Sequence, residues 1–105
     1  MFVSIKGRDY RWLRDALDRG DLPLVKATAA QLPAVDLPTA LEIALLVLER
    51  EPHNGERAAV RWLGRLCLER RDVTLGQVRE ALDAFALLGE EPEHAEATLG
   101  RLCSR

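Results

Sequence analysis

The sequence has few of the residues that metal sites and disulfide frameworks require. Its two cysteines, Cys67 and Cys103, lie 36 residues apart, and neither has a second cysteine nearby. A zinc-type cysteine pair is therefore absent, and we expect two buried, reduced thiols, with one disulfide as the alternative. The histidines His53 and His94 belong to no HExxH or HxxxH pattern. We expect both on the surface and no bound metal ion.

Long apolar runs are also missing. The longest, residues 40–48, contains Glu42 and is far shorter than the roughly 20 residues that span a bilayer. Residues 1–7 are too few for the apolar region of a secretory signal, and no cleavage pattern follows them. We therefore expect a cytoplasmic protein without a membrane segment.

Catalytic and phosphate-binding patterns are scarce. The seven glycines are scattered singly, so no phosphate-binding loop is formed, and Ser4 and Ser104 lie too near the termini for a rigid triad. We expect no enzymatic activity and no cofactor. The formal net charge of -2 lacks the basic excess of a general nucleic-acid binder, so we rank that class low.

Helix signals, in contrast, occur along the whole chain. Apolar residues recur at helical spacing, and Asp, Pro and Gly stand where helices begin and end. We predict an all-α fold of about six helices in a single domain, 1–105. The expected ranges are 9–19, 21–33, 36–50, 56–70, 72–89 and a short helix from residue 92.

Local patterns refine this prediction. The run 40–48 is apolar on nearly every face, which places the third helix at the centre of the domain. Residues 52–55 are expected to form a turn. Asp72 is expected to cap the fifth helix, whose inward residues would be Leu75, Val78, Leu82 and Phe85. The alternation of apolar residues near the start is compatible with an extended arm over residues 1–8.

An internal repeat is the clearest signal. Leu63-Gly64-Arg65-Leu66-Cys67 recurs 36 residues later as Leu99-Gly100-Arg101-Leu102-Cys103. A period of this size predicts helical hairpins that stack and share a continuous core. We therefore expect three stacked antiparallel hairpins that form a short α-solenoid.

The repeat resembles the tetratricopeptide (TPR) family. Leu63-Gly64 and Leu99-Gly100 look like the Leu-Gly pair of that repeat, and Pro92 looks like its closing proline, displaced by one helical turn. Cys67 and Cys103 stand where the family has an aromatic residue. The first 35 residues match poorly, so the resemblance covers at most two thirds of the chain. It implies a concave helical surface that binds peptides or partner proteins.

Four residues are candidates for partner binding. Arg57, Arg61 and Arg65 recur at every fourth position, so they share one face of the fourth helix. Such like charges repel unless acidic neighbours, such as Glu49 or Glu69, or an acidic partner offset them. Trp12 lies to one side of the inward stripe of the first helix, either at the core edge or as an exposed anchor.

These observations favour a non-catalytic protein–protein interaction or adaptor module that binds a protein partner or a second copy. A homodimer that buries Leu99 and Leu102 at the end of the sixth helix is compatible with the pattern. The alternative is a small DNA-binding regulator that uses its basic fourth helix.

Overall fold

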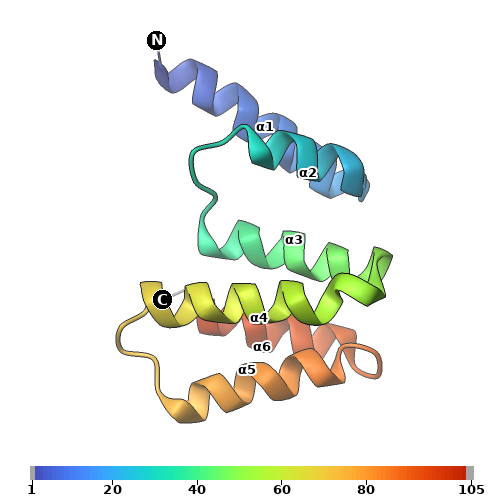
Figure 1. Ribbon diagram of the computed structural model, residues 1–105, viewed down its shortest axis with the longest axis vertical. Coiled ribbons are helices and arrows are strands. Elements are labelled where there is room, and N and C mark those ends of the chain that lie inside the picture. Colours follow the sequence, from blue (N-terminus) through green and yellow to red (C-terminus); the bar gives the residue numbers. More distant parts are fainter. Residues whose placement is uncertain (1, 104–105) are drawn as a thin grey trace.

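The computed structural model describes the backbone of residues 2–103 and the side chains of residues 10–103. In this part of the chain the structure is all-helical, with six helices and no strand (Figure 1). The helices are α1 (Phe2–Arg19), α2 (Leu22–Ala30), α3 (Leu37–Arg50), α4 (Pro52–Glu69), α5 (Leu75–Leu87) and α6 (Pro92–Cys103). The predicted all-α class and the number of helices are confirmed for these residues.

Polar caps begin α2 and α3 where the sequence predicts them. The Asp21 carboxylate accepts a hydrogen bond from the Leu24 amide at 3.2 Å, and Asp36 accepts one from the Thr39 amide at 3.0 Å. Each bond satisfies a backbone donor that has no partner inside the helix. α1 ends before Gly20, whose φ of +67° favours glycine. These two caps and this helix stop are confirmed.

Three predicted boundaries are wrong. α1 begins at Phe2, so residues 2–8 are helical and form no extended arm; Met1 lies outside the described residues. A helix pairs its own backbone groups, whereas a lone extended segment has no neighbouring strand to pair with. α4 begins at Pro52, so residues 52–55 form its first turn, where proline is well tolerated. Thr74 caps α5 in place of Asp72, because its hydroxyl and the Gln77 side chain form a reciprocal capping box.

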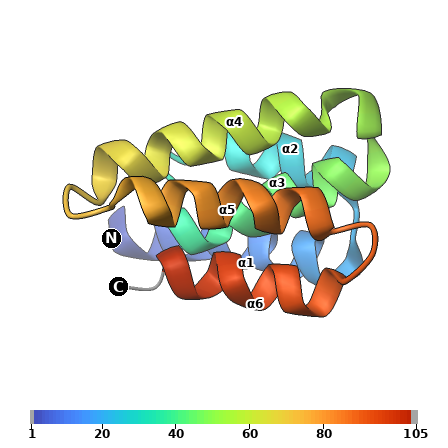
Figure 2. The same ribbon diagram turned by 90° about the horizontal axis from the view of Figure 1, so that it is seen from below.

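Helices that are adjacent in the sequence make the most extensive contacts. α1 packs against α2, α3 against α4, and α5 against α6 (Figure 1). Two further contacts, α3 with α6 and α4 with α5, bring the last four helices around a shared interior, which Figure 2 shows from below. α2 also contacts α3, so α3 joins the first pair of helices to the other three.

The core is divided into two clusters, and α3 contributes to both. The larger cluster contains Leu41 of α3, Leu66 of α4 and Leu99 of α6. The smaller one forms around Leu13 and Val25, with other side chains of α3 packed against it. Burial of each such side chain contributes about 1.5–3 kcal/mol to the free energy of unfolding. The predicted central position of α3 is therefore confirmed.

α5 meets the core with only part of the predicted face: Phe85 packs against the larger cluster and Val78 is half-buried, but the two leucines are exposed. Its buried residues are Ala81 and Ala84, whereas Leu75 is 89% exposed and Leu82 is 52% exposed. Ala81, Ala84 and Trp62 belong to the same core cluster, and the Trp62 ring meets Phe85 edge-on with centroids 5.7 Å apart. The core therefore meets α5 through Ala81, Ala84 and Phe85.

Candidate functional site

The structure places the four predicted contact residues on different surfaces. Trp12 lies on α1 and is 53% exposed. Arg57, Arg61 and Arg65 lie on α4, and α3 stands between α1 and α4 (Figure 1). The chain therefore does not bring Trp12 and the arginines into one patch.

Arg65 has a structural role within the chain. Its guanidinium donates to the Val35 carbonyl at 2.8 Å and to the Glu69 carboxylate at 2.7 Å. The first bond ties α4 to the segment that precedes α3, and the second is an ion pair one turn along α4. Glu69 is thus one of the acidic neighbours that the arginine spacing led us to expect. The Arg65 guanidinium therefore already has hydrogen-bond partners within the chain.

Arg57 and Arg61 differ from Arg65 because both are exposed and have no hydrogen bond or ion pair within the described residues. They line a hollow of about 230 Å³ together with Lys26 and Glu51. The Lys26 ammonium donates to the Glu51 carboxylate at 2.9 and 3.0 Å. This bond and one from Asn54 lower the pKa of Glu51. The cations of this hollow therefore outnumber its one carboxylate.

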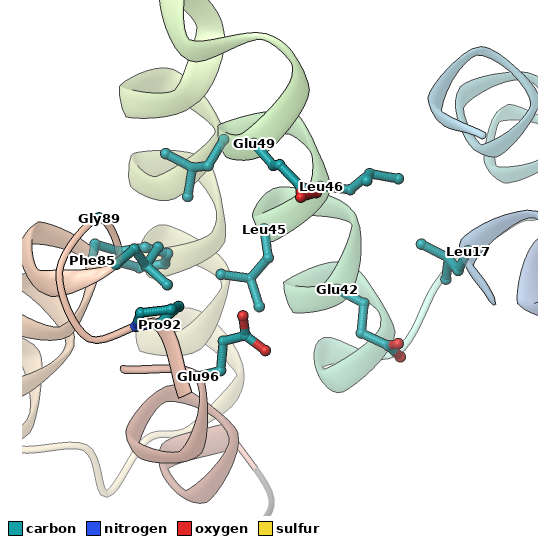
Figure 3. Close-up of a pocket in the computed structure, with 11 residues that line it drawn as sticks. Leu17, Glu42, Leu45, Leu46, Glu49, Phe85, Gly89, Pro92 and Glu96 are labelled. Atoms are coloured by element: carbon teal, nitrogen blue, oxygen red, sulfur yellow. The ribbon is translucent and has the colours of Figure 1, made fainter. Parts of the chain in front are cut away.

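A larger apolar groove of about 570 Å³ lies on another side of the molecule. We call it the α3 groove, because α3 forms its floor (Figure 3). The end of α1 forms one wall, and the turn between α5 and α6 forms the other. Its large apolar lining residues, all half-buried, are Leu17, Leu45, Leu46, Leu48, Phe85 and Leu88.

Carboxylates mark the edges of the α3 groove. Glu42 is held by Arg14, whose guanidinium donates to both carboxylate oxygens, at 2.7 and 2.5 Å. Glu49 has only a distant contact, 3.8 Å from Arg50 Nε. Glu96 is exposed and has no ion pair among residues 10–103, and Figure 3 shows its carboxylate directed toward Leu45. Among residues 10–103, no lysine, arginine or histidine lines the groove. It is therefore apolar inside and acidic at its edges.

The groove was missed in the sequence because its lining residues come from segments far apart, between Leu17 and Glu96. One signal was available. The run 40–48 is apolar on more faces than one neighbouring helix covers, which leaves leucines for a second surface. The sequence does not show which neighbouring helices leave these leucines uncovered.

The histidines and cysteines do not assemble a reactive site. Within the described residues, no group of three or more His, Cys, Asp or Glu side chains is placed to hold a metal ion. His53 and His94 are exposed, as predicted. Cys103 is buried, which raises the pKa of its thiol and agrees with the prediction, but Cys67 is exposed, so its predicted burial is wrong. The shared repeat motif therefore has two different environments.

The end of α6 is not a free apolar surface. Leu99 is fully buried and Leu102 nearly so, both in the larger core cluster. The expected homodimer contact through these two residues is therefore wrong, because their own chain already covers them.

Among residues 2–103, no helix is long and apolar enough to cross a bilayer. No protein-family model, curated protein or solved structure matches the chain.

Proposed function

We propose that this chain is a non-catalytic interaction module that binds an α-helical segment of a protein partner in the α3 groove. The observation that carries the proposal is the groove itself, with six large apolar side chains around about 570 Å³ of space. Half-buried leucine and phenylalanine side chains lose further contact with water when an apolar partner covers them. A groove of this kind accepts an amphipathic helix with apolar residues at i, i+3 or i+4, and i+7.

The edges of the groove define the charge of the partner. Among residues 10–103, Glu49 has only the 3.8 Å contact with Arg50 and Glu96 has no ion pair, and both lie beside the apolar floor. Lysine or arginine residues beside the apolar stripe of the partner would pair with them, whereas acidic residues would be repelled. The favoured partner is therefore a basic amphipathic helix.

Three consecutive hairpins, arranged as in TPR-like repeats, are the architecture that we propose for this module. The extensive contacts within α1–α2, α3–α4 and α5–α6 support it. In such an array a groove between neighbouring hairpins is the natural place for a ligand. The groove wall at Leu17 then belongs to the first hairpin, and the wall at Phe85 belongs to the third.

A peptide titration tests the proposal. The probe is a designed 16-residue amphipathic helix with leucines on one face and lysines beside them; its matched control has glutamates in place of the lysines. We expect the lysine peptide to shift the amide NMR signals of Leu45, Leu48 and Leu88, and the glutamate peptide to bind at least about tenfold more weakly. Leu45→Lys should reduce binding, whereas Leu82→Lys, on an exposed leucine outside the groove, should not. Shifts that do not cluster at the groove would contradict the proposal.

A second candidate function is DNA binding through α4. Arg57 and Arg61 favour it, because they lie exposed and without ion pairs among the described residues. The formal net charge of -2 opposes it. A gel shift with duplex DNA at low salt tests it, and the absence of any complex would remove this candidate.

A further inference from the structure

The exposed side of α4 carries an apolar stripe beside an arginine stripe. Val60 is 61% exposed and Leu68 is 81% exposed. They lie eight residues apart, which is about 12 Å along the helix axis. Gly64 lies between them, and a Cβ built there would meet nothing within 4 Å. We call Arg57, Val60, Arg61, Gly64 and Leu68 the α4 outer face.

This face has the two properties proposed above for a partner of the α3 groove, an apolar stripe and basic residues beside it. The apolar positions 60, 64 and 68 recur every fourth residue, as in an amphipathic helix that docks by one stripe. Arg57 and Arg61 lie along the same side and are not neutralised by other described residues. The glycine at the middle of the stripe lets the helix backbone approach a partner closely.

We propose that the α4 outer face of one copy of this chain docks in the α3 groove of a second copy. The proposal rests on the function proposed above, because it uses the same groove and names its occupant. The two surfaces complement each other in hydrophobicity and in charge. Val60 and Leu68 meet the leucine floor of the groove. Arg57 and Arg61 meet the carboxylates of Glu49 and Glu96. Charge complementarity favours this occupant over a second acidic groove.

The two surfaces do not meet within one chain. No α4 residue lines the α3 groove, and the α4 outer face is turned away from the core that α4 shares with α3 and α6. The contact between copies is therefore heterologous: each copy offers a groove on one side and a helix on another. Such contacts continue from copy to copy unless the rotation closes a ring. Assembly should go beyond a dimer.

Sedimentation velocity of the full chain from about 5 to 500 μM tests the proposal. We expect reversible, concentration-dependent species larger than a dimer, because the contact is heterologous. Raising the salt to about 0.5 M should shift the distribution toward monomer, since exposed Arg–Glu pairs are screened.

Matched variants identify the two halves of the contact. The face-blocked variant carries Val60→Asp and Leu68→Asp, and the groove-reversed variant carries Glu49→Lys and Glu96→Lys; all four side chains are exposed, so folding should be retained. Each variant alone should associate at least about tenfold more weakly than the parent chain. An equimolar mixture should form a heterodimer and nothing larger, because only one groove and one helix face remain. Leu82→Asp, which alters neither surface, should behave like the parent chain.

The outcomes separate the two proposals. A parent chain that stays monomeric up to 500 μM yet binds the lysine-flanked peptide in the groove overturns self-docking and supports the proposed function. A chain that neither associates with itself nor binds the peptide overturns both proposals. Association that survives in the face-blocked variant, or that stops at a dimer, overturns the heterologous contact described here.

Discussion

The Trp62 indole nitrogen donates a hydrogen bond to the Leu37 carbonyl at 3.1 Å, and this bond is buried. It joins the middle of α4 to the first residue of α3. The Trp62 side chain is almost fully buried in the larger core cluster. One side chain therefore fills space and also satisfies a backbone acceptor.

Replacing this side chain should lower stability strongly. Trp62→Phe removes the indole donor, leaves the Leu37 carbonyl without that partner, and opens a cavity. We expect the free energy of unfolding to fall by about 2–4 kcal/mol. Urea denaturation followed by circular dichroism measures the change. Leu75→Ala, at an 89% exposed position, is the control and should change it by less than about 0.5 kcal/mol. Equal effects of the two substitutions would contradict this assignment.

Two glycines in α4 should respond to alanine with opposite signs. A Cβ at Gly55 would lie 2.5 Å from Leu48 Cδ2, which is closer than carbon atoms pack, so the half-buried Leu48 side chain would have to move. Gly55→Ala should lower the free energy of unfolding by about 1–3 kcal/mol. Gly64→Ala should raise it by about 0.5–1 kcal/mol, because the added methyl meets nothing and alanine is the better helix former.

Thermal denaturation at low micromolar concentration compares these two variants without self-association. If Gly55→Ala proved neutral, the close approach of α3 and α4 at Leu48 would be wrong. Leu48 also lines the α3 groove. Gly55→Ala should therefore also weaken binding of the lysine-flanked peptide, whereas Gly64→Ala should leave peptide binding unchanged.

The sequence predicts what is local in this fold. The caps Asp21 and Asp36 and the stop at Gly20 depend only on nearby backbone groups, and all three are found. The central position of α3 follows from its own composition, because an all-round apolar helix needs neighbours on several sides.

Features that depend on the neighbouring helices are not predicted. Leu75 and Leu82 share a helical stripe with core positions, but the core contacts α5 through Ala81 and Ala84. Tertiary packing decides which side chains of α5 are buried, and no pattern within α5 reveals it. The groove is not predicted for the same reason, because its floor and walls come from α1, α3 and the region where α5 turns into α6.

Protonation of Asp36 should weaken the fold in acid. Hydrogen bonds from the Thr39 side chain and backbone and from Tyr10 hold the pKa of this carboxyl below its ordinary value of 3.8, although partial burial opposes the shift. A depressed pKa in the folded state contributes stability above the ordinary pKa, and this contribution is lost as the pH falls through the folded pKa. Asp36→Asn keeps a capping side chain but cannot ionise.

Urea midpoints measured between about pH 7 and pH 2.5 test this prediction. The parent chain should be more stable than Asp36→Asn at neutral pH, and the difference should shrink as the pH falls below 3.8. Parallel stability curves for the two proteins would show that the carboxylate gains nothing from Thr39 and Tyr10.

The two thiols should react at different rates, although they occupy equivalent positions in the repeated motif. Cys67 is exposed, whereas Cys103 is buried and the pKa of its thiol is raised by that burial. Because the thiolate is the reactive form, Cys103 should react with a disulfide reagent at least about tenfold more slowly than Cys67 at neutral pH. Cys67→Ser should abolish the fast phase and Cys103→Ser the slow one, and denaturant should make both thiols fast. Two equally fast phases in the folded chain would mean that Cys103 is not buried in the larger core cluster.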